Sequence, residues 1–185
     1  MSRELAVLWV ALALTLPNLA PRFAGATNAV DSRLVDQDGH AVAARELNGR
    51  WLLVYFGYAS CKEICPAALT TLTAVLERMG PAGNAIDPIF VSLDAEHDSP
   101  AVLKRFAASF HPRLRALSGS ADAVADAART FEVPWQRTSA SVLDHGTLFY
   151  LVAPDGRVVQ VLHPEQPVAD LAAAISKRMA ARASS

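Results

Sequence analysis

WLLVYFGYASCKEICP, residues Trp51–Pro66, is the stretch around which the rest of the chain is arranged. Its first six residues are apolar without alternation, which is typical of a central strand covered on both faces of a sheet. A short polar loop follows Gly57 and carries Cys61 and Cys65, the only two cysteines among the 185 residues. Because Pro66 suits the first turn of a helix, the sequence predicts that both thiols lie at a strand–helix junction.

Two thiols at the start of a helix suit either metal binding or thiol redox chemistry. The helix dipole and the unpaired N–H groups there stabilise a thiolate, so we expect a lowered pKa for at least one of Cys61 and Cys65. Two thiolates placed in this way either close into a disulfide or bind a soft cation such as Cu(I). A structural zinc site needs four ligands, and the chain has no paired histidine motif to add to its two cysteines.

A third ligand for such a site is available in His145, which follows Asp144 and precedes the predicted strand Thr147–Val152. From the start of a strand its imidazole would point across to Cys61 and Cys65 and complete a three-coordinate site, with Asp144 orienting the ring. On pattern alone, an isolated histidine is more often an ordinary polar residue with satisfied hydrogen bonds. The other histidines precede proline or lie in predicted turns and loops, and are weaker candidates: His40, His97, His111 and His163.

The composition indicates one globular domain with a full hydrophobic core. Hydrophobic residues make up 52% of the chain, charged residues make up 19%, and the net charge is -1. These values argue against intrinsic disorder. No basic run or stripe is present, so we expect no nucleic-acid partner. Two cysteines cannot form a disulfide framework that replaces a core, so the pair asks for another explanation, although a simple structural disulfide is an alternative.

Residues 1–26 are predicted to be a signal peptide or an N-terminal membrane anchor, followed by a single domain over residues 27–185. Leu5–Leu16 is an apolar segment, and Ala24-Gly25-Ala26 has the form of a signal-peptidase site. A membrane-spanning helix needs roughly 20 apolar residues, so a cleaved signal is favoured over a permanent anchor. Either arrangement would place the domain in an oxidising space outside the cytoplasm.

Strands and helices alternate along the predicted domain. The expected strands are Ser32–Val35, His40–Val42, Trp51–Phe56, Ile89–Leu93, Leu114–Leu117, Thr147–Val152 and Arg157–Leu162. Helices are expected after Pro66, Ser99 and Ser120 and near the C-terminus, whereas Val133–Leu143 lacks periodicity and predicts a loop. This order predicts an α/β fold: a mixed β-sheet flanked by helices, with an N-terminal β-hairpin. Ligands of such folds bind beyond the carboxyl ends of the strands, which is where the cysteine loop lies.

Three segments together resemble the Sco/SenC family. YFGYASCKEICPAALTTL is similar to the family's FG-x-x-x-C-x-x-x-C-P loop and the helix after it. VSLDAEHDSPAVLKRFAASFHPRLRALSGS resembles its S-[VLI]-D-x-x-x-D-[ST]-P stretch, and LDHGTLFYLVAPDGRVV resembles its D-H-[ST]-x-x-x-Y-L-[VI]-x-P-x-G block. The three occur in the family's order and cover roughly Leu47 to Leu162, which makes the resemblance much stronger than one motif alone.

The resemblance implies a thioredoxin-like fold and a copper site, for Cu(I) or Cu(II), made by Cys61, Cys65 and His145. Members of the family serve as copper chaperones or thiol-disulfide reductases in building the binuclear copper centre of cytochrome c oxidase. They work in the periplasm or the mitochondrial intermembrane space, often with a membrane tether. The implied partners are the apo copper subunit of cytochrome c oxidase, or another copper client, and a copper donor protein.

Several positions depart from the family pattern. Lys62 stands where the loop commonly has proline, Ser60 where it often has histidine, and Gly146 where it has Ser or Thr. We expect the positive charge of Lys62 to lower the pKa of both thiols. Asp94 and Asp98 match the family's acidic loop, where ligand tuning, partner contact and helix capping are all open roles, and for Asp98 we favour capping.

Copper binding and delivery is the leading functional hypothesis, and whether the protein is also an enzyme stays open. As a thiol-disulfide oxidoreductase it would use Cys61 as the attacking thiol and Cys65 as the resolving one. The C-x-x-x-C spacing argues against a general oxidoreductase, and His145-Gly146 occupies the place where thioredoxin relatives have a cis-proline. Peroxide reduction by Cys61 lacks recognisable Thr and Arg partners.

Overall fold

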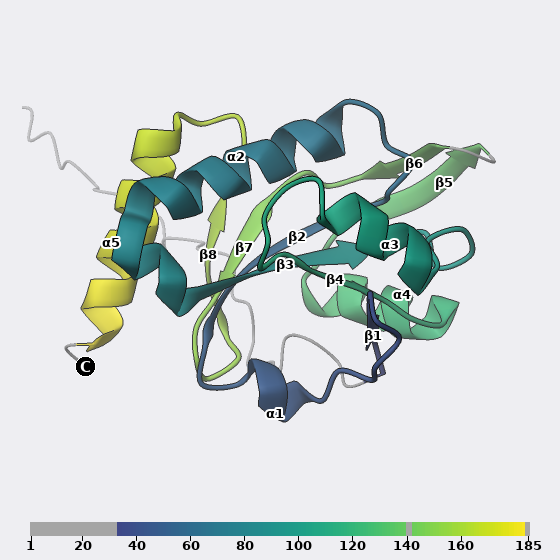
Figure 1. The fold of residues 1–185 in the computed structure, drawn as a ribbon, viewed down its shortest axis with the longest axis horizontal. Coiled ribbons are helices and arrows are strands. Elements are labelled where there is room, and N and C mark those ends of the chain that lie inside the picture. The colour runs from purple at the N-terminus through teal and green to yellow at the C-terminus, as the bar shows by residue number, and fades with distance from the viewer. Residues whose placement is uncertain (1–32, 140–141, 184–185) are drawn as a thin grey trace, which may run out of the picture.

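The computed structural model describes residues 33–139 and 142–183 (Figure 1), so the predicted signal peptide or anchor lies outside the described residues. The strands are β1 Val35–Asp36, β2 Trp51–Gly57, β3 Ile86–Ser92, β4 Arg115–Ser118, β5 Trp135–Ser139, β6 Val142–His145, β7 Phe149–Val152 and β8 Val158–Leu162. The helices are α1 Ala44–Leu47, α2 Ile64–Met79, α3 Pro100–Ala107, α4 Ala121–Thr130 and α5 Val168–Ala183, with a 3₁₀ helix, η1, over Gly80–Ala85. None of the helices in this described part combines the length and apolar character that a membrane crossing requires.

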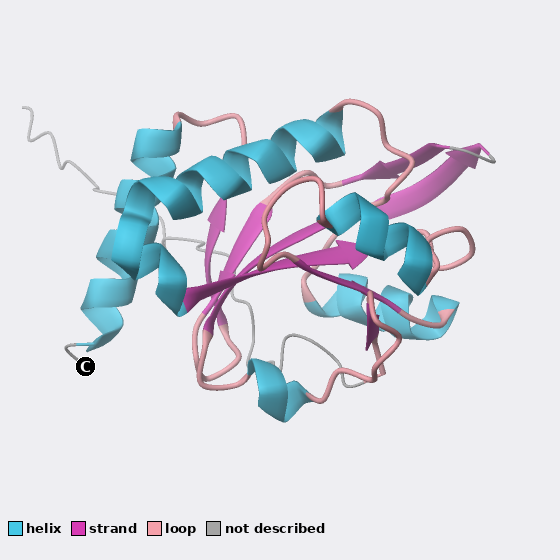
Figure 2. Cartoon of the chain, viewed as in Figure 1, coloured by secondary structure: helices cyan, strands magenta, loops and turns pink. Residues whose placement is uncertain are grey.

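Six strands form one mixed sheet in the order β1-β4-β3-β2-β7-β8. The central strand β2 runs parallel to β3 and antiparallel to β7. Helices α2 and α5 pack together over one face of the sheet, and α4 lies on the opposite face (Figures 1 and 2). The predicted α/β architecture, a mixed sheet flanked by helices, is confirmed.

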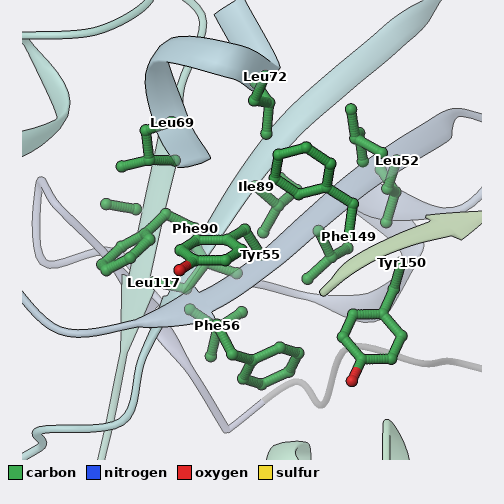
Figure 3. Packing of buried hydrophobic residues seen from close by; sticks show 14 of the residues in the cluster. Leu52, Tyr55, Phe56, Leu69, Leu72, Ile89, Phe90, Leu117, Phe149 and Tyr150 are labelled. Carbon is green, nitrogen blue, oxygen red and sulfur yellow. The ribbon is translucent and has the colours of Figure 1, made fainter. Parts of the chain in front are cut away.

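Burial on both faces explains why β2 is apolar without alternation. Every residue of the strand after its first is buried. Tyr55 points toward the α2 face, where its ring packs edge-on against Phe149 at a centroid distance of 5.7 Å. The next residue, Phe56, points toward the other face (Figure 3). Its ring packs against Phe131, just after α4, at a centroid distance of 5.1 Å. Each face of the strand therefore contributes its own half of the core.

The segment Val133–Leu143, predicted to be a loop, instead contains most of a β-hairpin, and that prediction is wrong. Strands β5 and β6 pair antiparallel as a separate two-stranded sheet that projects past the main one (Figure 2). The residues of β5 are exposed along its whole length. Because no face of β5 enters the core, the strand lacks the alternation by which a half-buried strand is recognised.

Other predicted boundaries shift for local reasons. The turn of the N-terminal hairpin is present, with Gly39 at φ +82°, but its return arm makes only the single bridge between Val35 and Ala41. Strand β3 begins at Ile86, earlier than predicted, and includes Pro88. Strand β4 pairs with β3 only from Ile89 onward, so Pro88 lies where no ladder hydrogen bond to β4 is needed.

Candidate metal and thiol site

Both cysteines lie at the N-terminal end of α2, as the sequence predicts. Cys61 is half-buried in the loop after β2, whereas Cys65 is fully buried in the first turn of α2. The backbone N–H of Cys65 donates to the Cys61 sulfur at 3.4 Å. The two residues are free thiols, and the loop brings their side chains together over one helix start.

The environment drives the pKa values of the two thiols in opposite directions. Burial raises the pKa of Cys65 to about 12. Burial also acts to raise the pKa of Cys61, but hydrogen bonds from the Cys65 backbone, the Cys65 thiol and the backbone of Glu63 outweigh it and lower that pKa. Lys62 is not among the main causes of either pKa shift, so the expected effect of its charge on the two thiols stays a prediction. Of the two thiols, Cys61 is the one that ionises first as the pH rises.

His145 faces the buried cysteine from the hairpin. It is the last residue of β6 rather than an early residue of the following strand, and its Nε2 lies 3.8 Å from the Cys65 sulfur. Its Nδ1 lies 2.9 Å from the carbonyl oxygen of Gly146. Because a carbonyl only accepts, Nδ1 carries the proton of the neutral ring and Nε2 presents a lone pair toward the sulfur. The predicted orienting role of Asp144 is wrong: its side chain is exposed, and the Gly146 carbonyl holds the ring.

The distance between Cys65 and His145 suits two ligands of one ion. Metal bonds of about 2.3 Å to a thiolate and about 2.0 Å to an imidazole, set roughly 120° apart, separate sulfur and nitrogen by about 3.7 Å. The observed separation is 3.8 Å. No group of three His, Cys, Asp or Glu side chains in the described ranges is already arranged to hold a metal ion. An ion bound here would therefore need a side-chain adjustment that brings Cys61, Cys65 and His145 around one point.

Aromatic rings and a glycine shape the pocket around the Cys65 sulfur. The rings of Tyr55 and Tyr58 meet the His145 ring edge-on, at centroid distances of 6.4 Å and 5.8 Å. At Gly57, a Cβ atom would lie only 2.8 Å from the Cys65 sulfur. A side chain at position 57 would therefore push that sulfur away from β2, which gives a steric reason for the glycine.

Asp98 holds the cysteine loop in place, and the prediction that it caps α3 is wrong. Its carboxylate accepts hydrogen bonds from the backbone N–H of Ala59 at 2.8 Å and from the Ser92 hydroxyl at 2.6 Å. The cap of α3 is Ser99, whose hydroxyl accepts from the N–H of Val102. Asp98 thus ties the loop that carries Cys61 to the end of β3. A pairing across 39 residues leaves no local sequence signal.

Asp94 performs a similar task for the hairpin that carries His145. Its carboxylate is almost completely buried and accepts from Arg137 of β5 at 2.7 Å and from His97 at 2.9 Å. Although burial acts to raise the pKa of Asp94, these two partners outweigh it and lower the pKa. At the base of the hairpin, the N–H of Gly146 donates to the carbonyl of Pro134 at 2.9 Å. Arg137 was not identified from the sequence because its segment was predicted to be a loop.

Comparison with known sequences gives a family match over most of the chain. The SCO1/SenC family profile matches residues 24–180. The protein SCO2 homolog, mitochondrial, of Danio rerio is 33% identical over 156 residues, which are 80% of this chain and 56% of that protein. The chain thus matches little more than half the length of this curated relative.

Solved structures give the same result for the fold. The crystal structure of ScoI from Arabidopsis thaliana with copper bound superposes with a TM-score of 0.75 at 30% identity, covering 79% of this chain and 94% of that one. BsSco, a member of the Sco family of cytochrome c oxidase assembly proteins in which a disulfide switch was identified, superposes with a TM-score of 0.67 at 26% identity, covering 78% and 89%. The thioredoxin-like fold that the resemblance implied is confirmed.

Proposed function

The chain belongs to the SCO1/SenC family, and from that membership we propose that it is a copper chaperone for the assembly of cytochrome c oxidase. Its cargo is copper, and its client is the copper subunit that contains the binuclear centre, or another copper protein. One similar structure contains copper, and another similar protein is described as belonging to a family of assembly proteins of this oxidase. These likenesses support the cargo and the client.

The approach of His145 to Cys65 is the observation that carries the proposal. A thiol sulfur and an imidazole nitrogen face each other at 3.8 Å from elements far apart in the sequence. Cys61 supplies the second thiolate, and its lowered pKa means that it is deprotonated most readily. Binding of a cation displaces the proton of Cys65, whose pKa burial has raised. We assign Cys61, Cys65 and His145 as the three ligands.

Delivery takes place by ligand exchange, which needs direct contact with the donor or the client. Cys61 is the outer ligand and the first that an incoming protein reaches. The large apolar side chains that are exposed among the described residues lie on the elements that carry the proposed ligands. They are Ile64, Trp135 and Val142, exposed by 57%, 37% and 46%. Ile64 begins α2 beside the cysteines, and the other two lie on the hairpin that carries His145. Their position supports a contact surface around the ligands.

A thiol-disulfide oxidoreductase is the second candidate, favoured by the contrast between the two thiols. The Cys61 thiolate would attack a disulfide of the client, form a mixed disulfide and release one client thiolate. Cys65 would then lose its proton and attack the Cys61 sulfur, which releases the second client thiolate. The client gains two electrons and this chain ends with a Cys61–Cys65 disulfide. Such a step would keep copper-site cysteines of the client reduced.

We place the protein outside the cytoplasm, in a periplasm or at the outer face of a membrane. The support is the apolar segment and the A-x-A site within residues 1–26, together with curated relatives that are mitochondrial proteins. Residues 27–185 form the working domain. An alkaline-phosphatase fusion after residue 30 that shows no activity in the periplasm would contradict this location.

Titration of the reduced protein with Cu(I) against a competing chelator tests the proposal. The wild type is expected to bind one Cu(I), and His145→Ala to bind it at least about 100-fold more weakly, a larger effect than removal of an outer-sphere partner. His163→Ala is the matched control, because that histidine is exposed and its Nδ1 contacts Glu165 instead. Equally weak binding by the wild type and His145→Ala contradicts the copper hypothesis. Rapid reduction of insulin by the same sample would favour the oxidoreductase.

A further inference from the structure

The Tyr55 hydroxyl is a buried polar group without a partner. Tyr55 lies in the middle of β2 and is completely buried. Among the buried side-chain nitrogen and oxygen atoms of residues 33–139 and 142–183, its hydroxyl oxygen alone has no hydrogen-bond partner. An unsatisfied buried donor carries a free-energy cost, so a tyrosine here instead of a phenylalanine calls for a reason.

The hydroxyl-bearing ring lies beside the proposed ligands. The position that a Cβ of Gly57 would take is 2.8 Å from the Cys65 sulfur and 3.2 Å from Cε1 of Tyr55, so sulfur and ring are neighbours across that glycine. The His145 ring stands edge-on to the Tyr55 ring at 6.4 Å. The two side chains also influence each other: after burial, the Cys65 sulfur is the largest cause of the raised pKa of Tyr55, and the Tyr55 hydroxyl acts to lower the pKa of Cys65.

We propose that Tyr55 is a positioning residue whose hydroxyl donates a hydrogen bond to the Cys65 sulfur when that sulfur is a metal-bound thiolate. The inference rests on the proposed function and adds to it. Among the described residues no acceptor, the Cys65 sulfur included, meets hydrogen-bond geometry with the hydroxyl. A thiolate is a charged and much stronger acceptor than a neutral thiol, so it draws the hydroxyl onto the sulfur. The hydrogen bond therefore forms in the loaded protein and is missing in the empty one.

Because of this arrangement, the buried hydroxyl stabilises only one state of the site. A disulfide sulfur carries no negative charge, so the oxidised protein leaves the hydroxyl as unsatisfied as the reduced, metal-free protein does. Only the thiolate held by a cation offsets the cost of burying the group. Tyr55 thus favours the loaded state over both alternatives without itself touching the cation.

Tyr55→Phe separates this role from a purely structural one, because it removes the hydroxyl and keeps the ring. We expect the metal-free, reduced variant to unfold in urea at the same or a higher denaturant concentration than the wild type. Its Kd for Cu(I), measured by chelator competition, is expected to rise about tenfold, as the loss of a hydrogen bond to a charged acceptor predicts. Tyr150→Phe is the matched control, since Tyr150 is also buried, on the opposite face of the sheet.

An unchanged Kd in Tyr55→Phe, with a wild type that binds Cu(I), overturns the inference and leaves the proposed function standing. A lower urea midpoint for the metal-free variant also overturns it, because the hydroxyl would then stabilise the empty fold. A wild type that does not bind Cu(I) overturns the proposed function itself, and the inference with it.

Discussion

Gly57 sets how closely the Cys65 sulfur approaches the central strand. The residue ends β2, and a methyl group in place of its hydrogen would lie 2.8 Å from the sulfur, which leaves no room for a side chain. Its backbone does not require glycine, so the constraint is the approach of the sulfur and the rings beside it. The affinity of the site for a metal therefore depends on the size of the residue at position 57, although this residue is not itself a ligand.

Gly57→Ala is expected to weaken Cu(I) binding by about 10- to 100-fold, the range typical of a change in the shell around the ligands. The added methyl group displaces the Cys65 sulfur from its place opposite His145. Chelator competition measures the effect, and Ser60→Ala, an exposed position in the same loop, is the control. Equal affinity in Gly57→Ala and Ser60→Ala would contradict the steric account.

The two cysteines are expected to react with iodoacetamide at very different rates. The pKa of Cys61 is lowered, so its thiolate fraction and its rate rise at a lower pH than for an ordinary thiol. The pKa of Cys65 is raised to about 12, so at about pH 8 it stays protonated and at least about 100-fold slower. Mass spectrometry of the first alkylated peptide measures the ratio, and the protein in denaturant is the control, where both thiols react alike. Preferential labelling of Cys65 in the folded protein would be inconsistent with this assignment.

The residues that carry chemistry differ in how far the sequence predicts them. Cys61 and Cys65 stand out because they are the only cysteines and flank a predicted helix start. His145 became a strong candidate only through the family resemblance, since one histidine carries little signal alone. Asp98 and Arg137 were not identified in their roles, because each acts through one contact with a residue far away in the chain.

At the scale of elements, the β5–β6 hairpin determines where His145 lies. The hairpin is a sheet of its own and shares no ladder with the six-stranded sheet (Figure 1). The ion pair between Arg137 and the buried Asp94 fastens it to the loop after β3. Because that carboxylate is shielded from water, removing Arg137 leaves a buried charge that has lost an ion-pair partner.

Arg137→Ala is expected to loosen the hairpin and to lower Cu(I) affinity by roughly tenfold, as for other supports of a metal ligand. Amide hydrogen exchange over residues 135–145 should become faster while exchange in β2 and β3 is unchanged. Arg157→Ala is the control, since it also removes an arginine ion pair from a hairpin, at the exposed turn between β7 and β8. Unchanged exchange and affinity in Arg137→Ala would show that the ion pair does not hold the hairpin.

At the scale of the whole molecule, the sheet carries the site on a core that is closed on both faces. Leu69 and Leu72 of α2 cover the Tyr55 face, while Phe56 and Tyr150 fill the other (Figure 3). The helix that covers the first face is also the one whose first turn contains Cys65. The packing that stabilises the fold therefore also fixes the depth of the buried thiol.

Leu72→Ala is expected to lower the free energy of unfolding by about 2–5 kcal/mol, because it deletes a completely buried side chain from the α2–sheet interface. Urea unfolding followed by circular dichroism measures the change. Thr70→Ala, an exposed position on the same helix, should stay within about 0.5–1 kcal/mol of the wild type. A loss below about 1 kcal/mol in Leu72→Ala would indicate that α2 does not pack as described.

The order of the main strands and helices follows from the sequence because those elements are buried and periodic. The continuous run of β2, the apolar face of α2 and the serine caps of α3 and α4 each leave a local pattern. The exposed hairpin leaves none, since its position comes from contacts at its base and from one ion pair. The fold could thus be predicted in outline, while the support of the site became visible only in the folded structure.

X-ray absorption at the copper edge of the Cu(I)-loaded protein tests most directly whether Cys61, Cys65 and His145 form one site. We predict a three-coordinate ion with two sulfur neighbours and one nitrogen neighbour, and loss of the nitrogen neighbour in His145→Ala. Two sulfur neighbours and no nitrogen in the wild type, with an unchanged spectrum in His145→Ala, would contradict the three-ligand assignment.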